Sequence, residues 1–307
     1  MRVRLLGRDP AFRAALALAR KAAPASSPVV LVGPTGSGKS LFARYLHERG
    51  AHPGAPFLEW SAASVPSTLL EPQLLGVEKG AATGVAERPG LFEAAERGTV
   101  CLTGLEELSQ AQQAILLRVL EGEPVERVGG HHPIRVRARV VAAFQEPPEA
   151  LAARGRLRRD LLYRLDVFRI ELPPLCGRAE DIAALAQHFL RAACRRNRRS
   201  VPILREDLVK ALQAHPWPGN VRELEQRMEA LALAGSEAVT AGDLPPSFWA
   251  GAGTIEEALG GRRTLAELKD AYIREVLARV GGSRTEAARW LGISRKALWE
   301  HLKRSGG

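Results

Sequence analysis

The chain has 307 residues, 46% of them hydrophobic and 25% charged, a balance that excludes wholesale disorder. No apolar run approaches the ~18 residues of a membrane span, and the first ten residues lack the apolar core of a secretion signal. The net charge of +10 favours a polyanionic partner such as nucleic acid, the alternative being a solvated basic surface. Three widely spaced cysteines match neither a disulfide framework nor a metal site, so we expect buried or inert thiols in a cytoplasmic protein: Cys101, Cys176 and Cys194.

Short β-branched runs alternate with helical stretches over residues 1–171, which is typical of a parallel sheet covered by helices on both faces. The expected strands lie at residues 29–32, 57–60, 99–102, 140–143 and 167–170. The strand pattern stops at Pro173, and from there to about Pro246 apolar residues recur at helical spacing. This pattern predicts an α/β unit followed by an all-helical one.

The strongest motif is a glycine-rich sequence, GPTGSGKS, that follows an expected buried strand and opens an expected helix. This is the context of a phosphate-binding loop, in which backbone N–H groups and the helix N-terminus attract phosphate. The Lys39 ammonium is expected to reach the β- and γ-phosphates, and the Ser40 hydroxyl to bind Mg²⁺. We expect a nucleoside triphosphate, ATP (or its diphosphate ADP), at residues Gly33, Pro34, Thr35, Gly36, Ser37, Gly38, Lys39, Ser40 and Leu41.

Hydrolysis requires a second strand that ends in acidic residues, which hold Mg²⁺ and polarise the attacking water. The best candidate strand ends in Thr103 and Gly104, and neither residue carries a carboxylate. Glu106 and Glu107 lie just downstream, where a small shift changes the depth and direction of a side chain. They are either substitute carboxylates or the solvated start of a helix.

Further short motifs are distributed along the chain. They are Leu5-Leu6-Gly7, Gly76, Glu78-Lys79-Gly80-Ala81, Thr83-Gly84, Phe92-Glu93-Ala94-Ala95, Gly98-Thr99, Arg158, Asp160-Leu161, Tyr163-Arg164-Leu165-Asp166-Val167, Leu172-Pro173-Pro174-Leu175, Arg178, Glu180-Asp181-Ile182 and Trp217-Pro218-Gly219-Asn220-Val221-Arg222-Glu223-Leu224. Together with the phosphate loop, they resemble the AAA+ activators of sigma-54 RNA polymerase, the bacterial enhancer-binding proteins. The resemblance covers nearly the whole chain and implies an AAA+ sheet followed by an α-helical lid.

The resemblance also implies roles for three arginines. Arg158 and Arg164 would act as arginine fingers in the nucleotide site of a neighbouring subunit, and Arg222 would contact the nucleotide from the lid. Fingers that act in trans imply a ring, typically a hexamer in this family. The alternative is that these arginines form surface or structural ion pairs.

The departures from the family pattern affect three linked steps: ATP hydrolysis, sensing of the γ-phosphate and contact with the polymerase. The GAFTGA loop that engages sigma-54 reads Gly80-Ala81-Ala82-Thr83-Gly84-Val85, so Ala82 replaces its aromatic residue. The Walker B acids are replaced by Thr103-Gly104, and Gln145 is only a candidate stand-in for the family's γ-phosphate sensor. Because losing one electrostatic contact of this kind costs about 2.7–4 kcal/mol of transition-state stabilisation, we expect weak or absent hydrolysis and weakly held Mg²⁺.

Residues 264–304 look like a Fis-type helix-turn-helix, with Gly292 in the turn and small residues Ala287 and Ala288 where two helices cross. Residues 262–304 hold 11 basic and 5 acidic residues, a net +6 that favours contact with DNA phosphates. The alternative is a three-helix dimerisation module with a basic face. The expected DNA-contacting residues are Arg284, Thr285, Ser294, Arg295, Lys296, Trp299 and Lys303.

These patterns predict a DNA-binding transcriptional regulator with a nucleotide-binding core that does not act through sigma-54. The alternatives are an active ATPase that remodels sigma-54 RNA polymerase through Glu106 or Glu107, and a scaffold stabilised by nucleotide. Because the core begins almost at Met1, we expect no receiver domain before it and control through nucleotide, a partner or synthesis level. The C-terminal segment is expected to dimerise on a roughly palindromic site, with RNA polymerase a further candidate partner. The predicted segments are residues 1–171 (AAA+ α/β subdomain), 172–249 (lid), 250–263 (Gly- and Ala-rich linker) and 264–307 (helix-turn-helix domain).

Overall fold

The computed structural model describes residues 3–80, 86–235, 237–245, 248–249, 264, 269, 272–273, 276–277, 283–295, 297–299 and 301. The chain divides into two compact units, Met1–Leu244 and Pro245–Gly307. Within the described ranges, no helix combines the length and the apolar character that crossing a bilayer requires.

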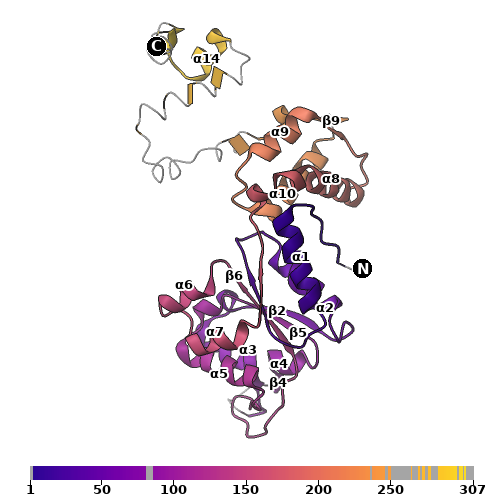
Figure 1. Ribbon diagram of the computed structural model, residues 1–307, viewed down its shortest axis with the longest axis vertical. Helices are drawn as coiled ribbons and strands as arrows, with labels where there is room; N and C mark the ends of the chain where they lie inside the picture. Colours follow the sequence, from indigo (N-terminus) through magenta and orange to yellow (C-terminus); the bar gives the residue numbers. More distant parts are fainter. Residues whose placement is uncertain are drawn as a thin grey trace. The chain divides into compact units, whose positions relative to one another are not determined.

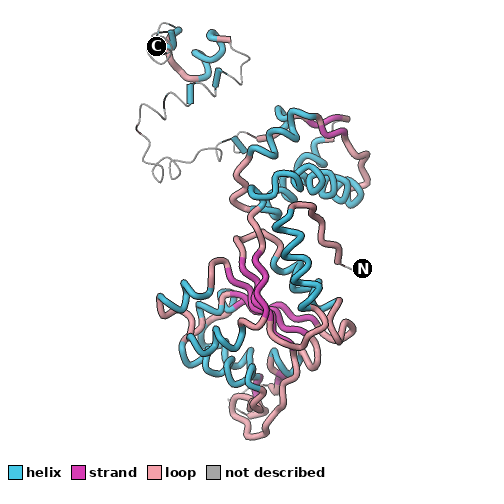
Figure 2. Tube along the Cα trace, in the orientation of Figure 1, coloured by secondary structure: helices cyan, strands magenta, loops and turns pink. Residues whose placement is uncertain are grey.

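Five strands form the central sheet of the first unit, in the order β2-β5-β6-β1-β7 (Figures 1 and 2). All neighbouring strands run parallel, which confirms the predicted α/β fold. The last strand begins at Phe168, one residue later than predicted, because Val167 is exposed on the preceding turn. The strand bounds are β1 Val29–Val32, β2 Phe57–Ser61, β5 Thr99–Thr103, β6 Arg139–Phe144 and β7 Phe168–Glu171.

Both faces of this sheet are buried, and successive residues of each strand point to opposite faces. On one face, Leu31 and Val141 pack against α1 and α2. On the other, Val30 and Val140 belong to the core formed with α3, α4, α5, α6 and α7 (Figure 1). Burial on both faces explains why the strands read as continuous apolar runs. The helix bounds are α1 Pro10–Ala22, α2 Lys39–Glu48, α3 Ser67–Leu75, α4 Leu91–Ala94, α5 Gln110–Glu121, α6 Pro148–Ala153 and α7 Arg159–Leu165.

Short elements join these layers. A two-residue antiparallel pair, β3 and β4, forms the stem of the segment that contains residues 81–85, which lie outside the described residues. The short elements are η1 Ala62–Ser64, β3 Gly76–Val77, β4 Arg88–Pro89 and η2 Leu105–Glu107.

Local capping fixes where two of the helices begin. The Asp9 carboxylate accepts a hydrogen bond from the N–H of Phe12 at the start of α1, which Pro10 opens. Ser109 and Gln112 form a reciprocal capping box at the start of α5. These polar residues satisfy N–H groups that have no partner within the helix.

Residues after β7 form a helical subdomain with the predicted spacing, so Ile182, Leu185 and Leu190 are buried along α8. The absence of strand signal there was misleading, because β8 and β9 form a short parallel pair. Two residues per strand are too few for an alternating pattern to be visible in the sequence. The bounds are η3 Leu175–Arg178, α8 Ala179–Arg196, β8 Ile203–Leu204, α9 Glu206–Ala214, α10 Asn220–Ala234, β9 Ala238–Val239 and η4 Ala241–Asp243.

The second unit contains a helical turn of the expected kind. Helix α14 (Arg284–Trp290) is followed by its C-cap Leu291 and by Gly292, whose φ of 65° lies in the left-handed region that favours glycine. The N–H groups of Gly292 and Ile293 bond to carbonyls of the preceding helical turn, which closes a Schellman motif. The small core of this unit comprises Ile273, Val276, Ala287, Ala288 and Leu298.

The three cysteines are free thiols. Cys101 and Cys194 are buried, and burial raises the pKa of the Cys101 thiol to about 12, so it is inert as a nucleophile. Cys176 is exposed, so burial does not protect it.

Candidate functional site

The carboxyl ends of three strands meet at one edge of the sheet. Val32 of β1 pairs with Phe144 of β6, and Thr103 of β5 pairs with Ala143. The residues that follow these strand ends are therefore neighbours. Such an edge is where ligands bind in open parallel sheets.

The phosphate loop occupies this edge and is held in a defined conformation. Gly36 and Gly38 have φ values of 76° and 102°, which the left-handed region permits for glycine. A Cβ on Gly36 would lie 2.2 Å from the carbonyl oxygen of Gly219, so this position also requires the absence of a side chain. The Lys39 ammonium donates to the carbonyl oxygens of Gly33 and Pro34 at 2.6 and 3.0 Å.

The lid contacts the loop directly. The N–H of Val221 donates to the carbonyl of Gly36 at 3.0 Å, and the Asn220 amide donates to the carbonyl of Thr35 at 2.9 Å. The same Asn220 side chain accepts from the N–H of Leu175 at 2.8 Å and is 3% exposed. The first turn of α10 therefore lies on the tip of the phosphate loop.

Three charged groups from separate elements influence one another at the loop. Burial lowers the pKa of Lys39 below its usual range, the nearby Arg222 guanidinium lowers it further, and the Glu106 carboxylate opposes both. The lid arginine, the loop lysine and a carboxylate from the segment after β5 are thus brought together. The sequence motifs predict the first two, and Glu106 was one of two open alternatives.

Other expected site residues are placed as follows. The Thr35 hydroxyl donates to the Gln145 side-chain oxygen at 3.0 Å, so Gln145 lies beside the loop as a sensor candidate would. Ser40 is exposed in the first turn of α2. At the end of β5, Thr103 donates to the carbonyl of Trp60 at 3.4 Å.

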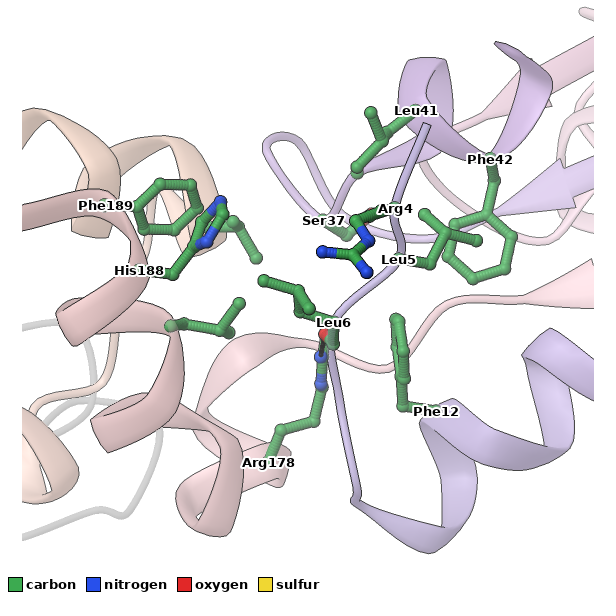
Figure 3. A pocket seen from close by; sticks show the side chains of 13 residues that line it. Arg4, Leu5, Leu6, Phe12, Ser37, Leu41, Phe42, Arg178, His188 and Phe189 are labelled. Atoms are coloured by element: carbon green, nitrogen blue, oxygen red, sulfur yellow. Dashed lines mark hydrogen bonds between the residues drawn. The ribbon is translucent and has the colours of Figure 1, made fainter. Parts of the chain in front are cut away.

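A pocket opens next to the phosphate loop (Figure 3). Its apolar lining, including Leu41 and Phe189, suits a flat apolar group such as a nucleobase. Leu41 is 44% exposed, so its side chain is open to a bound group. The lining residues are Arg4, Leu5, Leu6, Phe12, Ser37, Gly38, Leu41, Phe42, Arg178, Leu185, His188, Phe189 and Val221.

A buried ion pair ties one wall of this pocket to the lid. Arg178 and Asp181 are 2% and 1% exposed and pair at 2.9 Å. The Arg178 guanidinium also donates to the carbonyl of Leu6 at 3.1 Å and stacks over the Phe12 ring at 3.8 Å. The Asp181 carboxylate accepts from the N–H groups of residues 8 and 9. The N-terminal segment and the start of α8 are therefore one connected structure.

In the second unit, the expected DNA-contacting residues that are described lie on the surface. Arg284 and Thr285 open α14, and Ser294 caps the following helical residues through the N–H of Ala297 at 3.1 Å. Arg295 is exposed and Trp299 is 50% exposed. Lys296 and Lys303 lie outside the described residues.

Three family profiles match successive parts of the chain. The profile described as Sigma-54 interaction domain matches residues 5–171, and AAA+ ATPase lid domain matches residues 177–258. Bacterial regulatory protein, Fis family, matches residues 262–304. The chain belongs to the family of the bacterial enhancer-binding proteins.

Individual enhancer-binding proteins show the same similarity. Regulatory protein AtoC of Escherichia coli K12 is 39% identical over 295 residues, which is 93% of this chain and 64% of AtoC. Transcriptional regulatory protein ZraR of Salmonella typhimurium is 38% identical over 98% of this chain and 68% of ZraR. The crystal structure of NtrX from Brucella abortus in complex with ATP matches with a TM-score of 0.73 and 30% identity, over 99% of this chain and 69% of NtrX. The chain thus spans about two thirds of the length of these relatives.

Of the two arginine-finger candidates of this enhancer-binding protein, Arg158 caps the start of α7 and Arg164 lies within it; α7 packs against α5. Arg158 pairs with Asp160 at 2.7 Å, and Arg164 donates to the carbonyl of Leu120 at 3.1 Å. The first contact is an ion pair and the second a hydrogen bond to the backbone, both within the chain. Arg164 is exposed, so its guanidinium is also open to a neighbouring molecule.

The stem of the GAFTGA-like loop is fixed by one arginine. Arg127 binds both carboxylate oxygens of Glu93 and pairs with Glu87, and Glu78 lies 3.8 Å away. The hydrogen bond from Arg127 holds the pKa of Glu93 below its usual range. Ala82 and its neighbours lie outside the described residues.

Sequence reasoning missed two residues that shape the phosphate loop and the pocket beside it. Asn220 was quoted as part of a motif, and Asp181 likewise, without a role for either. One sequence signal pointed to Asn220, since the chain has only two asparagines and this one lies two residues before Arg222. The contact with Thr35 spans 185 residues, so no local pattern reveals it.

Proposed function

We propose that this enhancer-binding protein is a cytoplasmic DNA-binding regulator in which nucleotide occupancy, rather than rapid turnover, tunes the hold on DNA. The observation that carries this proposal is the combination of a complete phosphate loop with Thr103 and Gly104 where β5 should end in acids. We further propose that it does not act through sigma-54, because Ala82 removes the aromatic side chain of the contacting loop.

The nucleotide is ATP or ADP, with its phosphates on the glycine-rich loop and its base in the adjoining pocket. The complexes of Brucella NtrX with ATP and with ADP support this assignment. Mg²⁺ fits the residues present, since the Ser40 hydroxyl and the Glu106 carboxylate are oxygen donors of the kind that Mg²⁺ prefers. Bound there, the ion would neutralise charge on the phosphates. Lys39 would bind the phosphates and Arg222 would orient them from the lid.

The assembly follows from the arginines and the DNA-binding unit. Arg158 and Arg164 would enter a neighbouring subunit's site in a ring, for which a hexamer is the expected size. The Fis-type unit would dimerise on a roughly palindromic duplex. In this proposal, residues 1–171 and 172–249 form the ATPase-like core, and residues 250–263 link it to the DNA-binding domain at 264–307.

A second candidate function is an active ATPase that remodels sigma-54 RNA polymerase. The observation that favours it is the buried Oε2 atom of Glu106, which has no hydrogen-bond partner among the described residues and whose charge opposes the lowering of the Lys39 pKa. The sigma-54-dependent relatives of the chain also favour it.

One experiment separates the two functions. Mg-ATP binding and phosphate release are measured on the full chain, with Lys39→Ala as the control that removes phosphate binding. The first proposal expects Lys39-dependent binding with turnover orders of magnitude below that of active enhancer-binding proteins. Turnover comparable to theirs, together with open-complex formation by sigma-54 polymerase, would establish the second function instead.

A further inference from the structure

The segment after β5 turns sharply and sends its side chains in different directions. Gly104 has a φ of 71°, and the N–H of Glu107 closes the turn on the Gly104 carbonyl at 2.9 Å. Leu105 is fully buried in the main core and anchors the turn. The Glu107 side chain is 51% exposed and pairs with Arg156 at 2.9 Å. Glu106, between them, is free to point elsewhere.

The Glu106 side chain points inward. Its Oε2 atom is buried and has no hydrogen-bond partner among the described residues. Its charge also acts on Lys39, whose ammonium lies against the carbonyls of the phosphate loop. A buried carboxylate oxygen without a donor is costly, so such a group is expected to acquire a cationic partner when the site is filled.

Two features indicate that the cation comes with the ligand and that Glu106 is the acid that would bind it. The Lys39 ammonium is already engaged by the Gly33 and Pro34 carbonyls and is expected to turn to the phosphates of a ligand. Thr103, at the strand end, offers only a hydroxyl that donates to Trp60. Glu106 is therefore the acidic side chain whose charge the structure places at this loop lysine.

We propose that Glu106 is the carboxylate that holds the Mg²⁺ ion of a bound nucleoside triphosphate, in place of an acid at Thr103. This inference rests on the proposed nucleotide binding and adds to it the residue that makes binding depend on magnesium. Glu106 acts on the hydrated ion, and Ser40 supplies a second oxygen.

The sign of the effect of Glu106→Gln tests this role. Affinity for the non-hydrolysable analogue AMP-PNP is measured by calorimetry on the full chain, once with Mg²⁺ and once with EDTA. With Mg²⁺, the variant is expected to bind about 10–100-fold more weakly, as for other groups that support a metal. With EDTA, it is expected to bind at least as tightly as the wild type, because a negative charge near the phosphates has been removed.

Matched variants complete the experiment. Glu107→Gln removes the neighbouring carboxylate and is expected to leave both affinities within about twofold, since that carboxylate is exposed and solvent-screened. Adding Thr103→Asp to Glu106→Gln is expected to restore at least part of the magnesium dependence. Should Glu106→Gln unfold, Glu106→Asp replaces it: the shorter carboxylate is expected to weaken binding with Mg²⁺ and to leave binding with EDTA unchanged, because the charge is kept. Mn²⁺ binding followed by electron paramagnetic resonance reports the ion directly.

The outcomes are distinct. Equal weakening with Mg²⁺ and with EDTA would mean that Glu106 only orders Lys39, and an unchanged Mg²⁺ dependence would mean that it does not reach the ion; either result overturns the proposal while nucleotide binding stands. If the wild type binds no AMP-PNP, the proposed function itself fails and this inference fails with it.

Discussion

Replacing Asn220 by alanine is expected to destabilise the first unit by about 3–6 kcal/mol. The substitution leaves the buried N–H of Leu175 without an acceptor, which costs about 1–3 kcal/mol. The Thr35 carbonyl also loses a donor, at about 1 kcal/mol, because that bond is only partly buried. In addition, Asn220 has a φ of 52°, where alanine is disfavoured by about 1–2 kcal/mol.

Two companion variants separate these contributions. Asn220→Gly loses the same hydrogen bonds but tolerates the left-handed backbone, so it should be about 1–2 kcal/mol less destabilising than Asn220→Ala. Asn220→Asp keeps the acceptor for Leu175 but places a buried carboxylate oxygen against the Thr35 carbonyl, so we expect a loss of about 3 kcal/mol or more at neutral pH.

The assay is urea unfolding followed by far-ultraviolet circular dichroism, with free energies compared only where the denaturant slopes agree. A cost below about 1 kcal/mol for Asn220→Ala would refute the assignment of Asn220 as a buried bridge between lid and loop. Equal losses for the alanine and glycine variants would refute the backbone contribution alone.

Three further predictions concern other parts of the chain. Because Arg127 holds the pKa of Glu93 below 4.5, the ionised Glu93 stabilises the fold above that pH and the contribution is lost as pH falls through the lowered pKa; the stability difference between wild type and Glu93→Gln should therefore narrow between about pH 7 and about pH 3 in urea unfolding. Arg295→Ala should weaken binding to a mixed-sequence duplex and reduce the salt slope by about 1 in fluorescence anisotropy, and an unchanged slope would remove Arg295 from the phosphate contacts. Ellman's reagent should titrate one thiol, Cys176, in the native protein and all three after unfolding; rapid reaction of more than one would contradict the burial of the others.

Local chemistry made much of the fold predictable. Strand β1 is a run of β-branched and leucine residues followed at once by the glycine-rich loop, so both its burial and the place of Lys39 could be inferred from the sequence. Helix α8 repeats apolar residues at intervals of three and four, and the structure buries that stripe. Each of these signals lies within a few residues of the feature that it predicts.

The remaining features depend on contacts between distant segments or on one backbone angle. Strands β8 and β9 pair with each other within the lid, and two residues per strand are too few to show a strand pattern in the sequence. The contrast between Glu106 and Glu107 follows from the left-handed φ of Gly104, and the sequence alone allowed either carboxylate to face the loop.

The buried pair of Arg178 and Asp181 connects the residues just before α1 to the lid. Arg178 connects the start of α8 to the Leu6 carbonyl and the Phe12 ring, so a polypeptide joined upstream of Leu6 would be attached close to these contacts. Because Leu6, Phe12 and Arg178 line the pocket, a bulky fusion partner placed there is expected to change ligand binding in the pocket. A tag placed after the DNA-binding segment is not attached near this pair.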